Sequence, residues 1–361
     1  MNAVPDLPAL RGFAAIWLRS NCGCPACQDP VSGQRLTGIT DVPVDVSIRS
    51  ARLAGDLAQV VFGPDGHESV FSSAWLAAQR QPSGDDRCEG AKRLWVAADF
   101  AGRISQESWP RYRSAATARE ECLARLLRYG FFLLQDVPCE PGTVLDVAGT
   151  LGYVRETNYG RLFDVRVETT PANLANTGLA IAPHTDNPYR DPVPTVQLLH
   201  CLATAVAGGD SGLVDGFGAA ALLRGTDPVA FEILARTPVT FRYADATAEL
   251  VATRPMIGLD PQGRIREIRF NNRSLQPVSP DGGGASGQAA SFYAAYRKFA
   301  EVLSRPELML TFRLGPGDCM VFDNTRILHA RTAFAAAGRR HLQGCYADLD
   351  GVASTLAVLR R

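Results

Sequence analysis

The chain has 361 residues, 46% of them hydrophobic, and its 37 basic residues balance its 37 acidic ones. That length fits about two domains with ordinary hydrophobic cores. The balanced charge, without a long run of one sign, argues against a nucleic-acid footprint and a polybasic membrane surface, and no stretch approaches the ~20 apolar residues of a membrane span. We therefore expect small-molecule partners, no nucleic acid and no membrane.

The N-terminal residues and the cysteines bear on the compartment. Residues 1–5 contain neither a basic segment nor an apolar run, so no secretory signal is predicted and a cytoplasmic location is expected. The nine cysteines are odd in number and scattered apart from one cluster. This usage fits reduced thiols and a metal site better than a disulfide framework.

The cysteine cluster is the first candidate metal site. Cys22, Cys24 and Cys27 lie on a turn that contains Gly and Pro, where three thiolates can surround one Zn(II) and leave a fourth tetrahedral position. His67 follows the turn signal at 64–66 and the apolar run before it, so a hairpin could present it as that ligand. A closed Cys3His shell has no vacant position, which predicts a structural zinc. Metal-free cysteines and a surface His67 are the alternatives.

The remaining N-terminal pattern predicts a small β-rich domain. Val42, Val44, Val46 and Ile48 alternate with other residues, which is typical of a half-buried strand. A polar, turn-rich break follows at 81–86. We place the zinc domain at residues 1–99 and a catalytic domain at residues 100–361.

The second domain should be mainly β with helical insertions. Helices are expected over 117–129 and 144–151, each followed by a glycine, and over 228–236 and 291–303. Strand-like runs occur at 131–134, 163–167, 194–199, 241–243 and 265–270, and 281–287 is a Gly-rich loop by composition. Without a regular βαβ alternation, these runs favour an antiparallel double-sheet barrel over a doubly wound sheet.

Two remote motifs point to a second metal. His184 and Asp186 are two residues apart, so on an extended segment they project to one side, and the distant His329 can close the face of an octahedron. Two histidines and one carboxylate with open positions are the ligands of a non-haem Fe(II) oxygenase. The His-x-Asp motif is weak alone, because a chance match is roughly an even bet in this chain. A packed or solvated imidazole is the other interpretation.

The neighbours of these motifs strengthen the case. Arg340 follows His329 within Arg339-Arg340-His341, and Ser211 follows His184 within Gly-Gly-Asp-Ser. With them the sequence resembles the iron- and 2-oxoglutarate-dependent dioxygenases, in the branch of gamma-butyrobetaine and trimethyllysine hydroxylases. The resemblance implies a double-stranded β-helix (jelly roll), an N-terminal zinc domain like the one predicted above, and a homodimer.

The same resemblance implies the cofactor contacts. Fe(II) would be held by His184, Asp186 and His329, with 2-oxoglutarate and O2 at the open positions. Arg340, Ser211 and Leu199 would contact 2-oxoglutarate, and a guanidinium with a hydroxyl suits its distal carboxylate. Arg339 is the alternative to Arg340.

An aromatic cage for a trimethylammonium head is also implied, because a quaternary ammonium is best held by ring faces. Tyr159, Phe163 and Tyr346 match cage positions of the family. Asn176 and Asn187 stand where the family has tyrosines, and we expect Tyr189 to refill one of those places. For each ring alone, ordinary core packing is an equal alternative.

The residues expected around the anionic end of the substrate leave two candidate head groups, a carboxylate and a phosphonate. Asn173 and Asn272 match family asparagines that contact a carboxylate, and Arg273 adds a cation beside them. A guanidinium would favour a doubly charged head, so 2-(trimethylammonio)ethylphosphonate rivals gamma-butyrobetaine unless Arg273 faces solvent. Two other classes stay open here, a non-catalytic metal-binding module and a protein or nucleic-acid demethylase.

Overall fold

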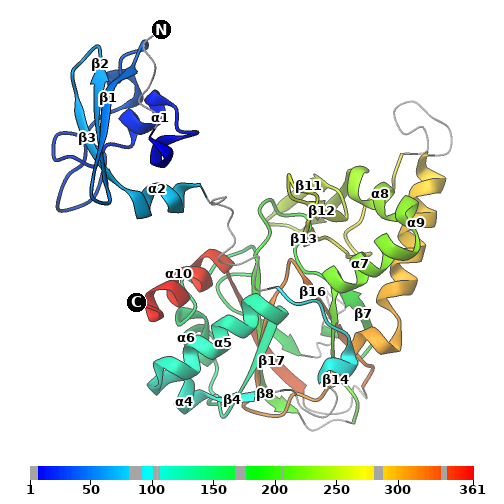
Figure 1. Cartoon of the computed structure of the whole chain (residues 1–361). Coiled ribbons are helices and arrows are strands. Elements are labelled where there is room, and N and C mark those ends of the chain that lie inside the picture. The colour runs from blue at the N-terminus through cyan, green and yellow to red at the C-terminus, as the bar shows by residue number, and fades with distance from the viewer. Residues whose placement is uncertain are drawn as a thin grey trace. The chain divides into compact units, whose positions relative to one another are not determined.

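A computed structural model describes residues 7–80, 92–100, 104, 106–166, 176–204, 207–279, 288–334 and 340–361. The chain divides into two compact units, Met1–Asp86 and Arg87–Arg361 (Figure 1). The Gly-rich loop at 281–287 lies outside the described residues. Among the helices of the described part, none is both long and apolar enough to cross a membrane.

The smaller unit is a three-stranded antiparallel sheet with short helices. Its elements are η1 (Pro8–Leu10), α1 (Ala15–Ser20), η2 (Ile39–Asp41), β1 (Ser47–Ala54), β2 (Leu57–Gly63), β3 (Glu68–Ser72) and α2 (Ser73–Gln79). The sheet order is β1-β2-β3, and the expected hairpin that presents His67 is the β2–β3 turn. Its core contains Leu18, Val60, Phe62 and Phe71. The expected β-rich unit is confirmed.

The strand predicted over 42–48 is wrong in most of its length. β1 begins only at Ser47, and the side chain of Val44 is fully exposed. Pro43 has no backbone N–H to donate to a neighbouring strand, so the alternating pattern around it did not become part of the sheet.

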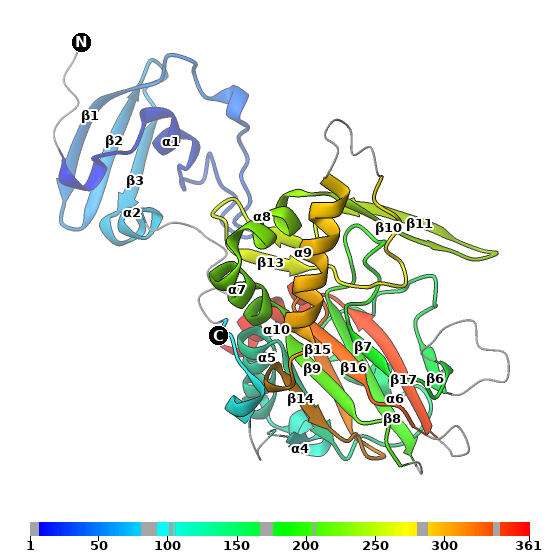
Figure 2. The same cartoon turned by 90° about the vertical axis from the view of Figure 1, so that its right-hand side faces the viewer.

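The larger unit contains the jelly roll. One sheet has the order β14-β9-β16-β7, and the other has the order β4-β5-β15-β8-β17-β6. Figure 2 shows the four strands of the first sheet side by side. The strands are β4 (Gln106–Ser108), β5 (Phe131–Gln135), β6 (Phe163–Arg166), β7 (Ile181–His184), β8 (Val196–Thr204), β9 (Ser211–Asp215), β14 (Met309–Phe312), β15 (Cys319–Asp323), β16 (Ile327–Arg331) and β17 (Arg340–Ala347). Among the strands that the structure describes, only β4 pairs parallel, with β5, so the predicted antiparallel double-sheet architecture is confirmed.

Helices cover the sheets on two sides. The larger sheet packs against α5 (Ala116–Tyr129), α6 (Thr143–Gly149) and α10 (Leu349–Leu359), with α4 (Trp109–Ser114) beside them (Figure 1). A second cluster joins α7 (Gly216–Thr226), α8 (Pro228–Arg236) and α9 (Gln288–Leu303) to β10 (Val239–Ala244), β11 (Glu249–Arg254), β12 (Ile257–Leu259) and β13 (Ile265–Ile268). Side chains from both jelly-roll sheets, including Leu213, Met320 and Leu342, form the core between them.

The predicted helices match α5, α6, α8 and α9 closely. Gly130, at φ 84°, ends α5 in the left-handed region that glycine favours. Sequence periodicity did not predict α7 or α10. The two compact units divide between residues 86 and 87, and Trp95 and Phe100 pack into the core of the larger unit.

Gly344 gives a test of the packing. A Cβ there would lie 2.4 Å from the Phe163 ring and 3.0 Å from the Leu198 carbonyl, so Gly344→Ala should destabilise the fold by about 1–3 kcal/mol. Gly225→Ala is the control, since nothing lies within 4 Å of its position on α7. We expect a lower Tm for Gly344→Ala alone in thermal unfolding. Equal Tm values for the two variants would contradict this packing.

Candidate metal centres and ligand cavity

Strand pairing brings the two predicted histidines together. His184 ends β7 and faces His329 of β16 in the antiparallel register, with 4.1 Å between the ring centroids. Asp186 Oδ1 lies 3.4 Å from His184 Nε2, and its Oδ2 lies 3.9 Å from His329 Nε2. One ligand atom from each residue lies within 4.8 Å of the others. The three side chains therefore share a common centre, as the sequence predicted.

Asp186 reaches this centre from a bend. The expectation that His184 and Asp186 project to one side of an extended segment is therefore wrong, although both side chains reach the centre. β7 ends at His184. The side chain of Asn324 accepts a hydrogen bond from Asp186 N (2.8 Å) and donates to Asp186 O (2.9 Å). Thr185 N donates to Phe270 O at 2.9 Å. Tertiary hydrogen bonds hold the carboxylate here in place of strand alternation.

The donor atoms fit a cation. His184 Nδ1 lies 3.0 Å from Ala182 O, and when Nδ1 donates to that carbonyl, Nε2 can offer a lone pair on the side of Asp186 Oδ1. A metal cation placed between these two atoms, which are 3.4 Å apart, would accept a lone pair from each. The set of two imidazoles and one carboxylate is the Fe(II) set expected from the sequence.

The charges of the cluster agree with ligand roles. Burial, and then the charge of His184, lowers the pKa of His329 to about 3, so its ring is neutral near neutral pH. Burial works to raise the pKa of Asp186, but His184, His329 and Arg273 outweigh it and hold that pKa well below its ordinary value. Neutral imidazole and ionised carboxylate are the forms that bind metals.

A cavity of about 180 Å³ opens on this cluster. It is lined by both histidines and Asp186, and by ten other residues predicted from sequence: Tyr159, Phe163, Asn176, Asn187, Tyr189, Leu199, Ser211, Arg273, Arg340 and Tyr346. Asn272 is exposed and does not line it. Asn173 and Arg339 lie outside the described residues.

Arg340 is a buried cation at the wall of this cavity. It starts β17 and is 8% exposed, and burial lowers its pKa. In the described part of the chain its hydrogen bond goes to Gly209 O at 3.4 Å, and none of the ion pairs there includes Arg340. Gly209 allows this approach, because a Cβ would lie 3.1 Å from Arg340 Nε. A buried guanidinium and the nearby Ser211 suit an anionic ligand.

Aromatic rings form another part of the wall. Phe163 lies between Tyr346 and Tyr159, at centroid distances of 5.2 and 6.2 Å. Tyr159 and Tyr189 join through their hydroxyls at 2.8 Å, and Tyr189 donates to Asn187 Oδ1 at 3.0 Å. Tyr189 thus occupies the wall beside Asn187, one of the two positions where the family has tyrosines.

Sequence reasoning missed several residues around the cavity. Gln197 Nε2 donates to Asp186 Oδ2 at 2.9 Å, and its position two residues before Leu199 on one strand was a usable signal. Arg331 lines the cavity and donates to the Thr177 and Leu179 carbonyls. Tyr243 stacks behind Tyr189 at 5.1 Å, and no local pattern marks it.

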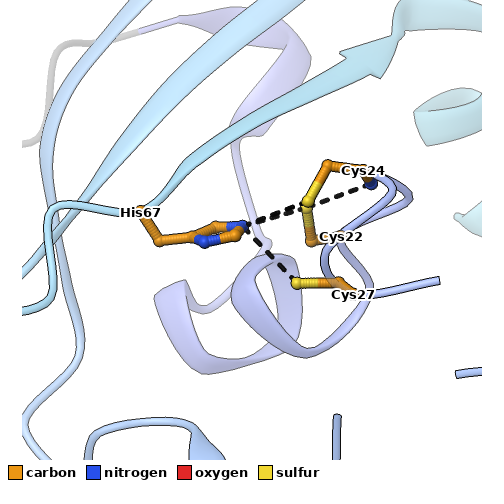
Figure 3. A group of neighbouring side chains, drawn as sticks. All are labelled: Cys22, Cys24, Cys27 and His67. Atoms are coloured by element: carbon orange, nitrogen blue, oxygen red, sulfur yellow. Dashed lines mark hydrogen bonds between the residues drawn. The ribbon is translucent and has the colours of Figure 1, made fainter. Parts of the chain in front are cut away.

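The cysteine cluster of the smaller unit forms a separate candidate centre (Figure 3). His67 Nε2 lies 3.2, 3.7 and 3.6 Å from the sulfurs of Cys22, Cys24 and Cys27. Tetrahedral zinc with ordinary bond lengths separates such atoms by about 3.5 Å. Burial raises the pKa of the Cys22 thiol and lowers that of His67, so the ring stays neutral while the thiol needs a cation to ionise.

Arg19 supports this second centre. Its guanidinium donates to Cys27 Sγ at 3.4 Å and to Asp65 at 3.0 Å, and Asp65 accepts from the backbone N–H of His67 at 3.2 Å. The geometry fits the expected Cys3His zinc shell.

A jelly roll whose cavity joins two histidines, one carboxylate and a buried arginine defines the class of Fe(II)- and 2-oxoglutarate-dependent oxygenases. Residues 97–346 match the family described as taurine catabolism dioxygenase TauD, TfdA family, and residues 11–77 match gamma-butyrobetaine hydroxylase-like, N-terminal. The chain belongs to the TauD/TfdA dioxygenase family and is a 2-oxoglutarate-dependent dioxygenase.

Curated relatives match over nearly the whole chain. A gamma-butyrobetaine dioxygenase from Pseudomonas sp. is 36% identical, with 97% of this chain and 91% of that protein covered. The human gamma-butyrobetaine dioxygenase is 32% identical, with 97% and 91% covered. A trimethyllysine dioxygenase from Meyerozyma guilliermondii is 29% identical, with 96% and 90% covered. This membership argues against the alternative of a non-catalytic metal-binding module.

Proposed function

We propose that this dioxygenase hydroxylates a small trimethylammonium zwitterion similar to gamma-butyrobetaine. One observation supports the proposal above all: a single cavity combines the His184, Asp186 and His329 donors with a buried cation, Arg340, and an aromatic wall. The names of the relatives add that proteins of this length and pattern act on such betaines.

The proposed roles follow from the donor chemistry. His184, Asp186 and His329 hold Fe(II), and Arg340 with Ser211 binds the distal carboxylate of 2-oxoglutarate, beside Leu199. When bound, Fe(II) would activate O2, the oxidant of this class, and 2-oxoglutarate would be the co-substrate oxidised to succinate and CO2. The chain itself supplies placement, because the reacting C–H must lie close to the metal for hydroxylation.

The aromatic wall is the proposed site of the quaternary ammonium. Tyr159, Phe163, Tyr189 and Tyr346 all line the cavity. The hydroxyl protons of Tyr159, Tyr189 and Tyr346 are engaged by Tyr189, Asn187 and Asp186, respectively. Ring faces and oxygen lone pairs are left to face a ligand, and a cation without N–H groups matches such a wall.

A phosphonate is the second candidate substrate, and Arg273 favours it. Arg273 lines the cavity, and its charge acts on Asp186 and Arg331. With Arg331 and Arg340, it adds a third guanidinium to the wall. A doubly charged head such as that of 2-(trimethylammonio)ethylphosphonate would gain more from this excess than a carboxylate would.

For the smaller unit we propose a structural zinc held by Cys22, Cys24, Cys27 and His67. All four ligand positions are then filled by protein, which leaves no place for substrate. We also propose that the protein is a cytoplasmic homodimer with a small-molecule substrate.

The alternative of a demethylase that acts on macromolecules is tested by measuring succinate release with methylated peptides beside free betaines.

The first prediction concerns catalysis. The wild type should convert 2-oxoglutarate to succinate in an O2-dependent reaction stimulated by gamma-butyrobetaine or its phosphonate analogue, more than by trimethyllysine. His184→Ala should lower that turnover by at least about 1000-fold, because one of the three metal donors is lost. His200→Leu is the control: His200 is also buried on β8 but does not line the cavity. Full turnover by His184→Ala would refute the iron site.

The second prediction separates the two substrates. Arg273→Ala should raise KM on the order of tenfold for the phosphonate and less for gamma-butyrobetaine, because the guanidinium pairs best with a dianion. Arg266→Ala is the matched control, since Arg266 is exposed on β13 away from the cavity. Steady-state kinetics on both substrates measure the ratio. Equal changes in the two KM values would contradict a phosphonate-selective role for Arg273.

The third prediction concerns the zinc site. The wild type should retain about one zinc per chain through dialysis against a weak chelator, because closed sites of this kind bind with ~10–16 kcal/mol of apparent free energy. Cys24→Ser should lose most of that zinc, whereas Cys139→Ser, which changes an exposed free cysteine, should keep it. Elemental analysis decides, and undiminished zinc in Cys24→Ser would rule the site out.

A further inference from the structure

Two hydrogen-bond donors to which the proposed chemistry assigns no role, the Gln197 amide and the Tyr346 hydroxyl, converge on one oxygen of Asp186. Gln197 Nε2 donates to Asp186 Oδ2 at 2.9 Å, and the Tyr346 hydroxyl donates to the same atom at 3.2 Å. No such donor among the described residues reaches Oδ1, which instead faces His184 Nε2. The two oxygens of the carboxylate therefore have different surroundings.

Sheet register makes this pair of donors. Gln197 on β8 lies directly opposite Tyr346 on β17, so the two side chains project from one face of the larger sheet. They are 1% and 3% exposed, so water does not compete for their bonds to Asp186. Gln197 Oε1 has no hydrogen-bond partner in the described part of the chain, so Asp186 alone decides which way the amide points.

The main chain of Asp186 is held separately. Asn324, which is 1% exposed, bonds both the N–H and the carbonyl of Asp186 and also donates to Pro194 O. With the backbone fixed, the carboxylate can still move by rotation about its side-chain bonds. The hydrogen bonds from Gln197 and Tyr346 restrict that rotation.

This arrangement matters because a carboxylate can bind a metal through one oxygen or through both. An octahedral ion with three protein donors keeps three positions, enough for a chelating keto acid and for O2. If Asp186 used both oxygens, four protein atoms would leave two positions. Hydrogen bonds that occupy Oδ2 favour the first arrangement.

We propose that Gln197 and Tyr346 are positioning residues that commit Asp186 to bind the metal through Oδ1 alone and so keep room for 2-oxoglutarate. The inference rests on the proposed iron site and adds to it. Tyr346 then has two parts with different tasks, a ring for the substrate wall and a hydroxyl for the metal ligand.

The test measures two affinities on the full chain without turnover. Mn(II) serves as the probe metal, and its Kd is measured by isothermal titration calorimetry; the Kd of 2-oxoglutarate is then measured on Mn(II)-loaded protein. Gln197→Met keeps the chain length and removes the donor, and Tyr346→Phe keeps the ring and removes the hydroxyl. We expect the Mn(II) Kd to stay within about threefold, and the 2-oxoglutarate Kd to rise about tenfold in each variant and more in the double variant.

Gln343→Met is the matched control. Gln343 is also buried, lies on β17, and donates to a carboxylate, Asp164 Oδ1, at 3.0 Å, but that carboxylate is not a proposed metal ligand. Its two Kd values should equal those of the wild type. During turnover, the Gln343→Met variant should also form succinate and hydroxylated product in a one-to-one ratio.

The outcomes separate this inference from the proposed function. If the wild type binds both Mn(II) and 2-oxoglutarate and the Gln197 and Tyr346 variants match Gln343→Met, the positioning role is overturned and the iron site stands. A parallel loss of Mn(II) affinity, 2-oxoglutarate affinity and Tm also overturns it, because general damage then explains the result. A wild type that binds neither Mn(II) nor 2-oxoglutarate overturns the proposed function together with this inference.

Discussion

The pairing of β7 with β16 is the constraint on which the active site depends. It sets His184 opposite His329, although the two are far apart in sequence, and their ring centroids are 4.1 Å apart. Bringing these groups together costs free energy, because the two rings and the Asp186 carboxylate are polar groups largely withdrawn from water, with 8%, 13% and 24% of the His184, His329 and Asp186 side chains exposed. Packing of the jelly-roll core offsets this desolvation cost, and a bound cation would lower it by pairing with the three side chains. Stability and metal binding are therefore linked in this unit.

Residue types and spacing were enough to predict which side chains come together at both candidate centres. Cysteines close in sequence and a histidine on a hairpin need little tertiary information, and the β2–β3 turn places His67 as expected. The helices with glycine stops were equally accessible, since both signals are local. The strand expected around Val44 failed for a local reason too, because Pro43 cannot join a ladder.

The parts that sequence could not predict are contacts between remote strands. The position of Asp186 depends on Asn324, and its carboxylate depends on a pair formed by β8 and β17. Tyr243 reaches the back of the aromatic wall from β10. Spacing along the chain does not encode such relations, because register is decided by the packing of the whole sheet. The class of enzyme was therefore predictable from the sequence, whereas the hydrogen bonds that hold each proposed metal ligand in place could be found only in the structure.

The charge distribution around Asp186 gives a final argument about the substrate. Arg273 acts on this carboxylate electrostatically, while burial and the charge of Asp186 raise the pKa of the Tyr159 and Tyr346 hydroxyls in the aromatic wall. A guanidinium attracts an anion, whereas ring faces attract a cation. A ligand that satisfies both must have opposite charges at its two ends, with the carbons between them beside the metal. A zwitterion with a short linker meets this condition, and the distance between its charges, more than either head group alone, then selects which carbon is presented for hydroxylation.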